Sequence, residues 1–213
     1  MLYGVGEGGT GLAKTMVAVV SPATALSFLA VTKLFILHAH VDTEYYLQKG
    51  SMTFLQVGKI ETYGQGCDGP LEKVVRDFMV EGDAVNLIDM KAGIEHFGRK
   101  IPDRMDVILG VLDYTLESIS IAKRMAAFCQ DAGIRNFWLI LNKIVSEEIE
   151  SMILAKLLDL QHRVLGSISY DQELIKIGLS GNALEECRAL DEMVAIVDSL
   201  EQVVSKSHFS EDG

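Results

Sequence analysis

Short apolar runs that suit β-strands alternate along this chain with longer stretches that carry an amphipathic helical pattern. Residues 147–158 illustrate the helical pattern, because Ile149, Ile153 and Leu157 recur at the spacing that lines one face of a helix. Alternating strands and helices are typical of a mostly parallel sheet with helices on both faces. The sequence therefore predicts the α/β class, with a sheet between two helical layers.

The pattern places individual elements as well. The expected strands are residues 2–5, 34–37, 53–57, 84–88, 107–112, 136–141 and 163–168, and the expected helices are residues 14–31, 70–80, 116–131, 147–158 and 183–204. Glycines and tyrosines interrupt any long period between residues 42 and 66, which favours a loop or a short excursion there.

Composition limits the class of protein. With 213 residues, of which 49% are apolar, the chain can bury one sizeable core, so we expect a single domain over residues 1–206 and a disordered tail over residues 207–213. The formal charge of −11, without any basic run, argues against a nucleic-acid partner. Cys67, Cys129 and Cys187 are odd in number and widely spaced, which favours a reducing cytoplasm over a disulfide framework.

The apolar stretch over residues 16–31 approaches the length of a membrane span. Ser21, Pro22 and Ser27 interrupt it, and Lys33 follows it. We therefore expect a buried helix that packs on the sheet and no stable membrane insertion.

The stretch GVGEGGTGLAKTMVA, residues 4–18, is rich in glycine and is expected to lie between a strand and a helix. Glycines allow backbone N–H groups to point at a phosphate, the following helix presents its positive end, and a lysine neutralises charge. The candidate phosphate-binding residues are Gly6, Gly8, Gly9, Thr10, Gly11, Lys14 and Thr15.

This stretch departs from the phosphate-binding pattern G-x-x-x-x-G-K-[ST], because Leu12 and Ala13 occupy the positions of the lysine and the hydroxyl residue. If a helix begins just after Gly11, the two extra residues rotate Lys14 by about 200°, away from the phosphates. Two interpretations remain open. Leu12 and Ala13 can bulge as extra loop, or the segment is a glycine-rich turn that binds nothing.

Two other strands are followed by candidate ligands. Asp89 ends an apolar strand, where a carboxylate can serve a nucleotide-bound magnesium, although taken in isolation the residue fits a capping or turn-forming aspartate better. Asn142 and Lys143 follow another apolar strand, where an amide can read the edge of a purine.

Several segments together carry a family resemblance. The segments GEGGTG with the following KT, AVNLIDMKAGIEHFGR, LNKI and VLGSISYDQEL resemble the CooC-type accessory ATPases for nickel insertion into carbon monoxide dehydrogenase, within the MinD/ParA-like P-loop group. The resemblance implies a three-layer P-loop NTPase fold, binding of ATP or ADP with magnesium, a homodimer, and delivery of metal to the carbon monoxide dehydrogenase apoenzyme. It implies magnesium ligation by Thr15 and Asp89, with Lys14, Asp89 and Asp42 as candidate catalytic residues.

The chain departs from this family at positions that bear on catalysis. Glu7 stands where the family has a signature lysine that reaches the partner's phosphates. His38 and His40 stand in the place of an aspartate pair, and Asp42 is the nearest carboxylate.

The metal motif also differs. The family's C-x-C is reduced to Cys67, with Gly69 in the second position, so an inter-subunit nickel or zinc site would have one thiolate from each chain. An ordinary loop thiol is the alternative. A metal-binding pair formed by His38 and His40 is a further alternative. Two functions fit these departures: a P-loop ATPase with impaired hydrolysis that assists nickel insertion, and a non-catalytic module that acts through protein partners.

Overall fold

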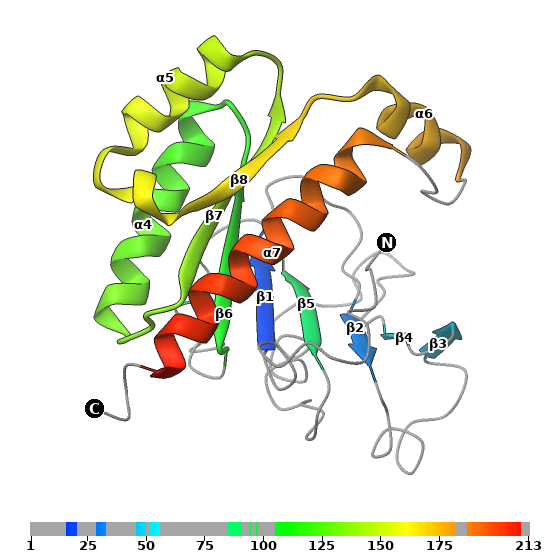
Figure 1. The fold of residues 1–213 in the computed structure, drawn as a ribbon, viewed down its shortest axis with the longest axis horizontal. Coiled ribbons are helices and arrows are strands. Elements are labelled where there is room, and N and C mark those ends of the chain that lie inside the picture. Colours follow the sequence, from blue (N-terminus) through cyan, green and yellow to red (C-terminus); the bar gives the residue numbers. More distant parts are fainter. Residues whose placement is uncertain are drawn as a thin grey trace, which may run out of the picture. The chain divides into compact units, whose positions relative to one another are not determined.

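The fold is described from a computed structural model of the chain (Figure 1). The structure describes residues 16–20, 29–32, 46–49, 52–55, 85–90, 94, 97, 105–181 and 187–209. These residues fall into two compact units. The C-terminal unit contains the described residues of 109–127 and 137–209, and the N-terminal unit contains those of 13–108 and 128–136.

The N-terminal unit contains a mixed sheet. Its strands are β1 (Met16–Val20), β2 (Leu29–Thr32), β3 (Tyr46–Lys49), β4 (Met52–Leu55) and β5 (Asn86–Met90), in the order β3-β4-β2-β5-β1. β1 and β5 are parallel, with Val19 opposite Asp89. β2 is antiparallel to both β4 and β5, and β3 is antiparallel to β4. Parallel pairing is therefore limited in this unit to β1 and β5 among the strands whose pairing is described.

The predicted helix over residues 14–31 is wrong, because β1 and β2 occupy this stretch. Val17, Val19 and Val20 are β-branched, and such residues favour strands because their χ1 angles are restricted in a helix. The predicted strands 2–5 and 34–37 and the helix 70–80 lie outside the described residues. β3 falls in the segment that we expected to be a loop.

The C-terminal unit follows the predicted alternation closely. Its elements are β6 (Val107–Leu112), which begins in the N-terminal unit, α4 (Leu116–Asp131), which ends there, β7 (Phe137–Ile144), α5 (Glu147–Leu157), the 3₁₀-helix η3 (Leu158–Arg163), β8 (Val164–Ser169), α6 (Gln172–Ser180) and α7 (Arg188–Phe209). β6 and α4 have the predicted bounds. β7 continues three residues beyond the predicted end, and α6 was not predicted.

The elements of the C-terminal unit begin and end at residues suited to those positions. Ser146 caps α5, because its side chain accepts a hydrogen bond from the backbone N of Ile149 at 3.3 Å. Asp171 caps α6 in the same way, through the N of Glu173 at 2.8 Å. Gly181 follows α6 with φ of 69°, a left-handed conformation that glycine adopts without strain.

The core of the C-terminal unit lies on both sides of its strands. Leu139 and Leu141 of β7 are fully buried, and Leu157 of α5 and Val204 of α7 are each 1% exposed. A Cβ atom placed on Gly166 of β8 would lie 2.8 Å from Cγ1 of Ile196, so α7 rests directly on the backbone of this strand.

Ser167, which follows Gly166 in β8, contacts α5 on the other side of the sheet. The hydroxyl of Ser167 donates a hydrogen bond to Glu150 of α5. Since successive side chains of a strand point to opposite faces, α5 and α7 cover opposite faces of β8 (Figure 1). This arrangement confirms the helix, sheet and helix layers predicted for the α/β class.

The predicted C-terminal helix is confirmed with shifted bounds. α7 extends to Phe209, three residues into the expected tail at 207–213, and residues 210–213 lie outside the described part of the chain. None of the helices in the described residues is both long enough and apolar enough to span a membrane.

Candidate functional site

The C-terminal ends of β7 and β8 lie side by side. The two strands are parallel, and Ile144 of β7 is the register partner of Ser169 of β8. Directly after β8, the backbone N of Tyr170 donates a hydrogen bond of 2.8 Å to the carbonyl oxygen of Ile144. Ligands of open α/β sheets bind at the carboxyl ends of the strands, so this edge is a candidate site.

A bulge shapes the end of β7. Leu141 is opposite Ser167 and Ile144 is opposite Ser169, so β7 advances three residues while β8 advances two. Lys143 absorbs the extra length with φ of 61°, which is uncommon for a residue other than glycine. Bulges of this kind change the direction of side chains next to functional sites.

Asn142 and Lys143 lie in this bulge. The side-chain oxygen of Asn142 accepts a hydrogen bond of 2.9 Å from the backbone N of Lys143, which fixes the orientation of the carboxamide. Asn142 is half-buried and Lys143 is exposed. A carboxamide held in this way can offer a donor and an acceptor to a purine, and the ammonium group is available to an anion.

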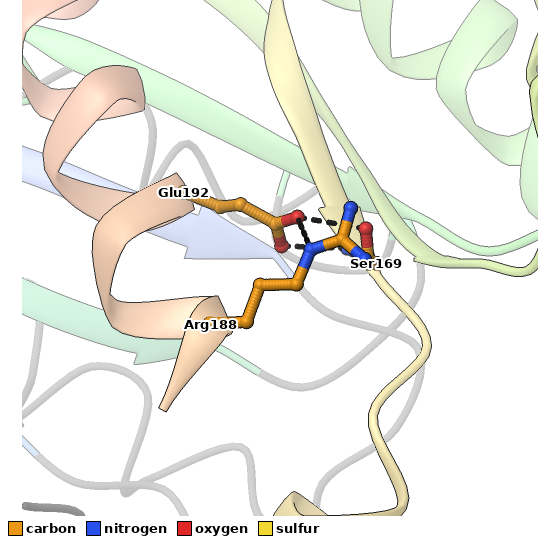
Figure 2. Close-up of polar contacts among 3 residues, drawn as sticks. All are labelled: Ser169, Arg188 and Glu192. Carbon is orange, nitrogen blue, oxygen red and sulfur yellow. Dashed lines mark hydrogen bonds and ion pairs between the residues drawn. The ribbon is translucent and has the colours of Figure 1, made fainter. Parts of the chain in front are cut away.

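Glu192 of α7 holds the end of β8 (Figure 2). Its Oε2 accepts a hydrogen bond of 2.8 Å from the backbone N of Ser169, and its Oε1 accepts one of 2.7 Å from the hydroxyl of the same residue. The Nε of Arg188, one turn earlier in α7, donates to Oε1 at 2.9 Å. The carboxylate therefore joins the start of α7 to the last residue of β8.

The surroundings of Glu192 favour its ionised form. Burial opposes ionisation, but hydrogen bonds from Ser169 and the charge of Arg188 outweigh it, so the pKa of Glu192 is lowered. The side chain of Glu192 is 19% exposed, whereas that of Arg188 is 72% exposed. The hydrogen bonds from Ser169 are consequently the better shielded part of this cluster.

Asp89 lies in the N-terminal unit, next to the end of β5. Burial raises the pKa of this half-buried carboxyl group to about 6. A nearby cation would lower that pKa, because it favours the charged form. Carboxylate oxygens are ligands that magnesium accepts, usually together with water and phosphate oxygens, so Asp89 fits a magnesium site in its chemistry.

The turn after β6 is occupied by its own hydrogen bonds. Oδ1 of Asp113 accepts from the N and the hydroxyl of Thr115, at 2.9 and 2.6 Å, and Oγ1 of Thr115 accepts from the N of Ser118 at 3.1 Å. These contacts fix the start of α4. They give the turn a structural role that does not require a ligand.

Asn142 and Lys143, which are neighbours in the sequence, lie near the carboxyl end of β7, and Asp89 lies near the end of β5 in the other unit. The remaining predicted site residues lie outside the described ranges, namely Gly6, Gly8, Gly9, Thr10, Gly11, Lys14, Thr15, Asp42, Cys67, His38 and His40. β1 begins directly after Thr15, so residues 16–20 form a strand where the sequence predicted a helix. Among the described residues, no group of three or more His, Cys, Asp or Glu could hold a metal ion.

Sequence reasoning missed Ser169 and Glu192. The segment that contains Ser169 carries part of the family resemblance but received no role, and Glu192 lies in the predicted helix over residues 183–204 without any role. The available signal was the pair Arg188 and Glu192, whose i, i+4 spacing in the first turns of α7 favours an ion pair. Their contact with Ser169 spans 23 residues and has no local signature.

Comparison with known proteins gives the class of fold and several relatives. No protein-family model matches the chain. An uncharacterized ATP-binding protein of Methanocaldococcus jannaschii is 40% identical over 141 residues, which cover 63% of this chain and 54% of that protein. A second ATP-binding protein of this organism is 32% identical over 161 residues, covering 74% and 62%.

A third relative has a named role. The carbon monoxide dehydrogenase accessory protein CooC of Rhodospirillum rubrum is 30% identical over 147 residues, which cover 66% of this chain and 55% of that protein. The chain thus spans between about half and two thirds of the length of these three relatives.

Solved structures agree on the fold. The MinD cell division protein of Aquifex aeolicus superposes with a TM-score of 0.54 at 19% identity, over 92% of this chain and 87% of that one. MinD in its complex with MinC, from the same organism, gives a TM-score of 0.52 at 18% identity, over 92% and 86%. The chain has the fold of the MinD-like P-loop NTPases.

Proposed function

We propose that this chain binds ATP or ADP with magnesium and acts in the cytoplasm as a homodimeric accessory protein for nickel insertion into carbon monoxide dehydrogenase. The observation that carries the proposal is the similarity to CooC of Rhodospirillum rubrum, at 30% identity over 147 residues. The two ATP-binding relatives from Methanocaldococcus jannaschii support the nucleotide part.

The proposed function gives a separate role to each of three parts of the chain. Asn142 and Lys143, fixed in the bulge of β7, would hold the base. Asp89 would serve the magnesium, which its carboxylate suits. The phosphates would be held by the glycine-rich segment, with Gly6, Gly8, Gly9, Thr10, Gly11, Lys14 and Thr15 as the residues to test. Bound magnesium would neutralise phosphate charge.

Calorimetric titration of the chain with Mg-ATP tests this site directly. We expect saturable binding that weakens about tenfold or more in Lys14→Ala, since hydrogen bonds to charged groups are strong. Asp89→Asn should weaken binding only when magnesium is present. Lys123→Ala, an exposed lysine of α4, is the matched control and should bind as the wild type does. Tight binding that survives Lys14→Ala would remove that residue from the site.

A non-catalytic binding module is the second candidate function. It is favoured by β1, which begins directly after Thr15 in place of the helix that a phosphate loop requires. Glu7 and His38 occupy the positions where the resemblance implies a lysine and an aspartate. The same titration separates the two functions, because a module of this kind binds Mg-ATP weakly or not at all. Steady-state release of phosphate, with Asp42→Asn as a variant, measures any hydrolysis.

The metal part of the proposal rests on Cys67. One thiolate per chain closes a nickel or zinc site only across a dimer, so we expect one ion per two chains. Size-exclusion mass measurement with added nickel tests the wild type beside Cys67→Ser, with Cys187→Ser as the control. Metal retained by Cys67→Ser would move the site to His38 and His40.

The client enzyme is tested by reconstitution. Carbon monoxide dehydrogenase apoenzyme is incubated with nickel, Mg-ATP and this chain, and carbon monoxide oxidation is measured. We expect faster activation with the wild type than with Lys14→Ala. Equal activation with and without the chain would refute the accessory role while leaving nucleotide binding intact.

A further inference from the structure

Glu192 concentrates several donors on one carboxylate that is mostly buried. Three hydrogen bonds reach it, two from Ser169 and one from Arg188 (Figure 2). An exposed ion pair adds little to stability, and Arg188 is 72% exposed. Hydrogen bonds to a charged, shielded group are stronger. The contacts with Ser169 are therefore the ones that hold the position of the strand end.

Ser169 faces a direction that the strand alone does not explain. Ser167, two residues earlier, contacts Glu150 of α5, and side chains two apart in a regular strand share a face. Ser169 instead contacts Glu192 of α7, on the opposite face. Ser169 is the last residue of β8, and its register partner Ile144 directly follows the bulge of β7.

The end of β8 is also tied to the end of β7. Ser169 is the register partner of Ile144, and the N of Tyr170 donates to the carbonyl oxygen of Ile144 at 2.8 Å. Asn142 lies two residues before Ile144, in the bulge. A continuous path of described contacts therefore leads from Glu192 through the two strand ends to the bulge that orients Asn142.

We propose that Glu192 is a positioning residue for nucleotide-base recognition, acting through Ser169 on the β7 bulge that carries Asn142. The inference rests on the proposed nucleotide site, and adds to it a residue that touches neither the base nor the phosphates. The proposal has a specific consequence. Weakening the contact between Glu192 and Ser169 should reduce the preference for one base over another and leave the affinity for phosphate groups unchanged. A purely structural tether would lower stability without altering base preference.

The test compares three ligands by calorimetric titration with magnesium: ATP, GTP and inorganic tripolyphosphate. The variants are Ser169→Ala, which removes the hydroxyl and keeps the backbone N–H, and Glu192→Gln, which keeps the shape and removes the charge. We expect the preference for ATP over GTP to fall about fivefold to tenfold in each, and tripolyphosphate affinity to change less than about twofold. Ser199→Ala and Glu201→Gln, in the same helix, are matched controls that should keep the wild-type preference.

The outcomes distinguish this inference from the function on which it rests. A wild type that binds no nucleotide overturns both. A wild type that binds ATP but does not discriminate against GTP overturns only the inference, as does unchanged discrimination in both variants. An equal loss of affinity for all three ligands would indicate general damage to the site, and it would also overturn the inference. Thermal unfolding of each variant establishes that it is folded, and Ser169→Ala suffices if Glu192→Gln does not fold.

Discussion

The segments 16–31 and 107–131 are both strongly apolar, yet their sequences predict their structures with opposite success. Residues 107–131 form β6 and α4 at the predicted bounds. Residues 16–31, predicted as one helix, contain β1 and most of β2. The difference lies in periodicity: α4 alternates apolar and polar residues with the helical repeat, whereas residues 16–20 are apolar without interruption. A continuous apolar run identifies burial but does not identify the backbone conformation.

The largest effect is expected in the core of the C-terminal unit. Leu139→Ala should destabilise the chain by about 2–5 kcal/mol, because Leu139 is fully buried and its removal leaves a cavity. Leu179→Ala, at a side chain that is 84% exposed, should change stability by less than about 0.5 kcal/mol. Urea unfolding followed by circular dichroism measures both. Equal effects would mean that β7 does not form the core described here.

The contact between α7 and β8 predicts a smaller effect. Gly166→Ala should cost about 1–3 kcal/mol, because the new methyl group meets Ile196. In Gly166→Ala with Ile196→Ala, the combined loss should be less than the sum of the single losses. Gly178→Ala, in α6, meets nothing within 4 Å and should stabilise the chain by about 0.5–1 kcal/mol. A loss that is additive in the double variant argues against the close packing.

The conformation of residues 16–20 can be tested by propensity. Valine favours a strand and alanine favours a helix, so Val17→Ala with Val19→Ala should destabilise the chain by about 1 kcal/mol if β1 is a strand. Ser120→Ala, at an exposed position in α4, should be neutral or slightly stabilising. A stabilising double alanine variant would restore the helix that the sequence first suggested.

The smallest effect concerns Asp89 and depends on pH. Its pKa is raised from 3.8 to about 6, so the unfolded chain loses this proton at a lower pH than the folded chain. This group's contribution to stability is therefore complete below pH 3.8 and is lost as the pH rises to about 6. Asp89→Asn should gain stability relative to the wild type across that interval and keep the gain above it.

Thermal unfolding at several pH values in the absence of magnesium follows the difference between Asp89→Asn and the wild type. The Asp89 side chain is partly exposed, so screening by solvent limits the size of this stability difference. Asp131→Asn, at the exposed end of α4, serves as the control. A difference that is constant with pH would contradict the raised pKa.

In the candidate site, as in the fold, features set by a local run of sequence could be predicted, and features that depend on contacts between distant residues could not. The position of Asn142 close to the carboxyl end of a strand could be predicted, because it follows an apolar run; its role as a ligand of a base stays a prediction. The bulge could not be predicted, since it depends on the register between β7 and β8. Glu192 and Ser169 meet only when α7 packs on β8, so their contact depends on tertiary structure and not on any local pattern.

Because α7 packs on β8, the order in which the two elements are synthesised affects how the chain folds on the ribosome. β8 is complete at Ser169, but the helix that covers it runs from Arg188 to Phe209 and is made later. At about 5–20 residues per second, a ribosome needs roughly 2–8 seconds to supply those forty residues. During that interval the backbone at Gly166 and the donors of Ser169 lack their partners in α7. Nascent chains should therefore be most open to chaperones, and to pairing with one another, just before α7 emerges.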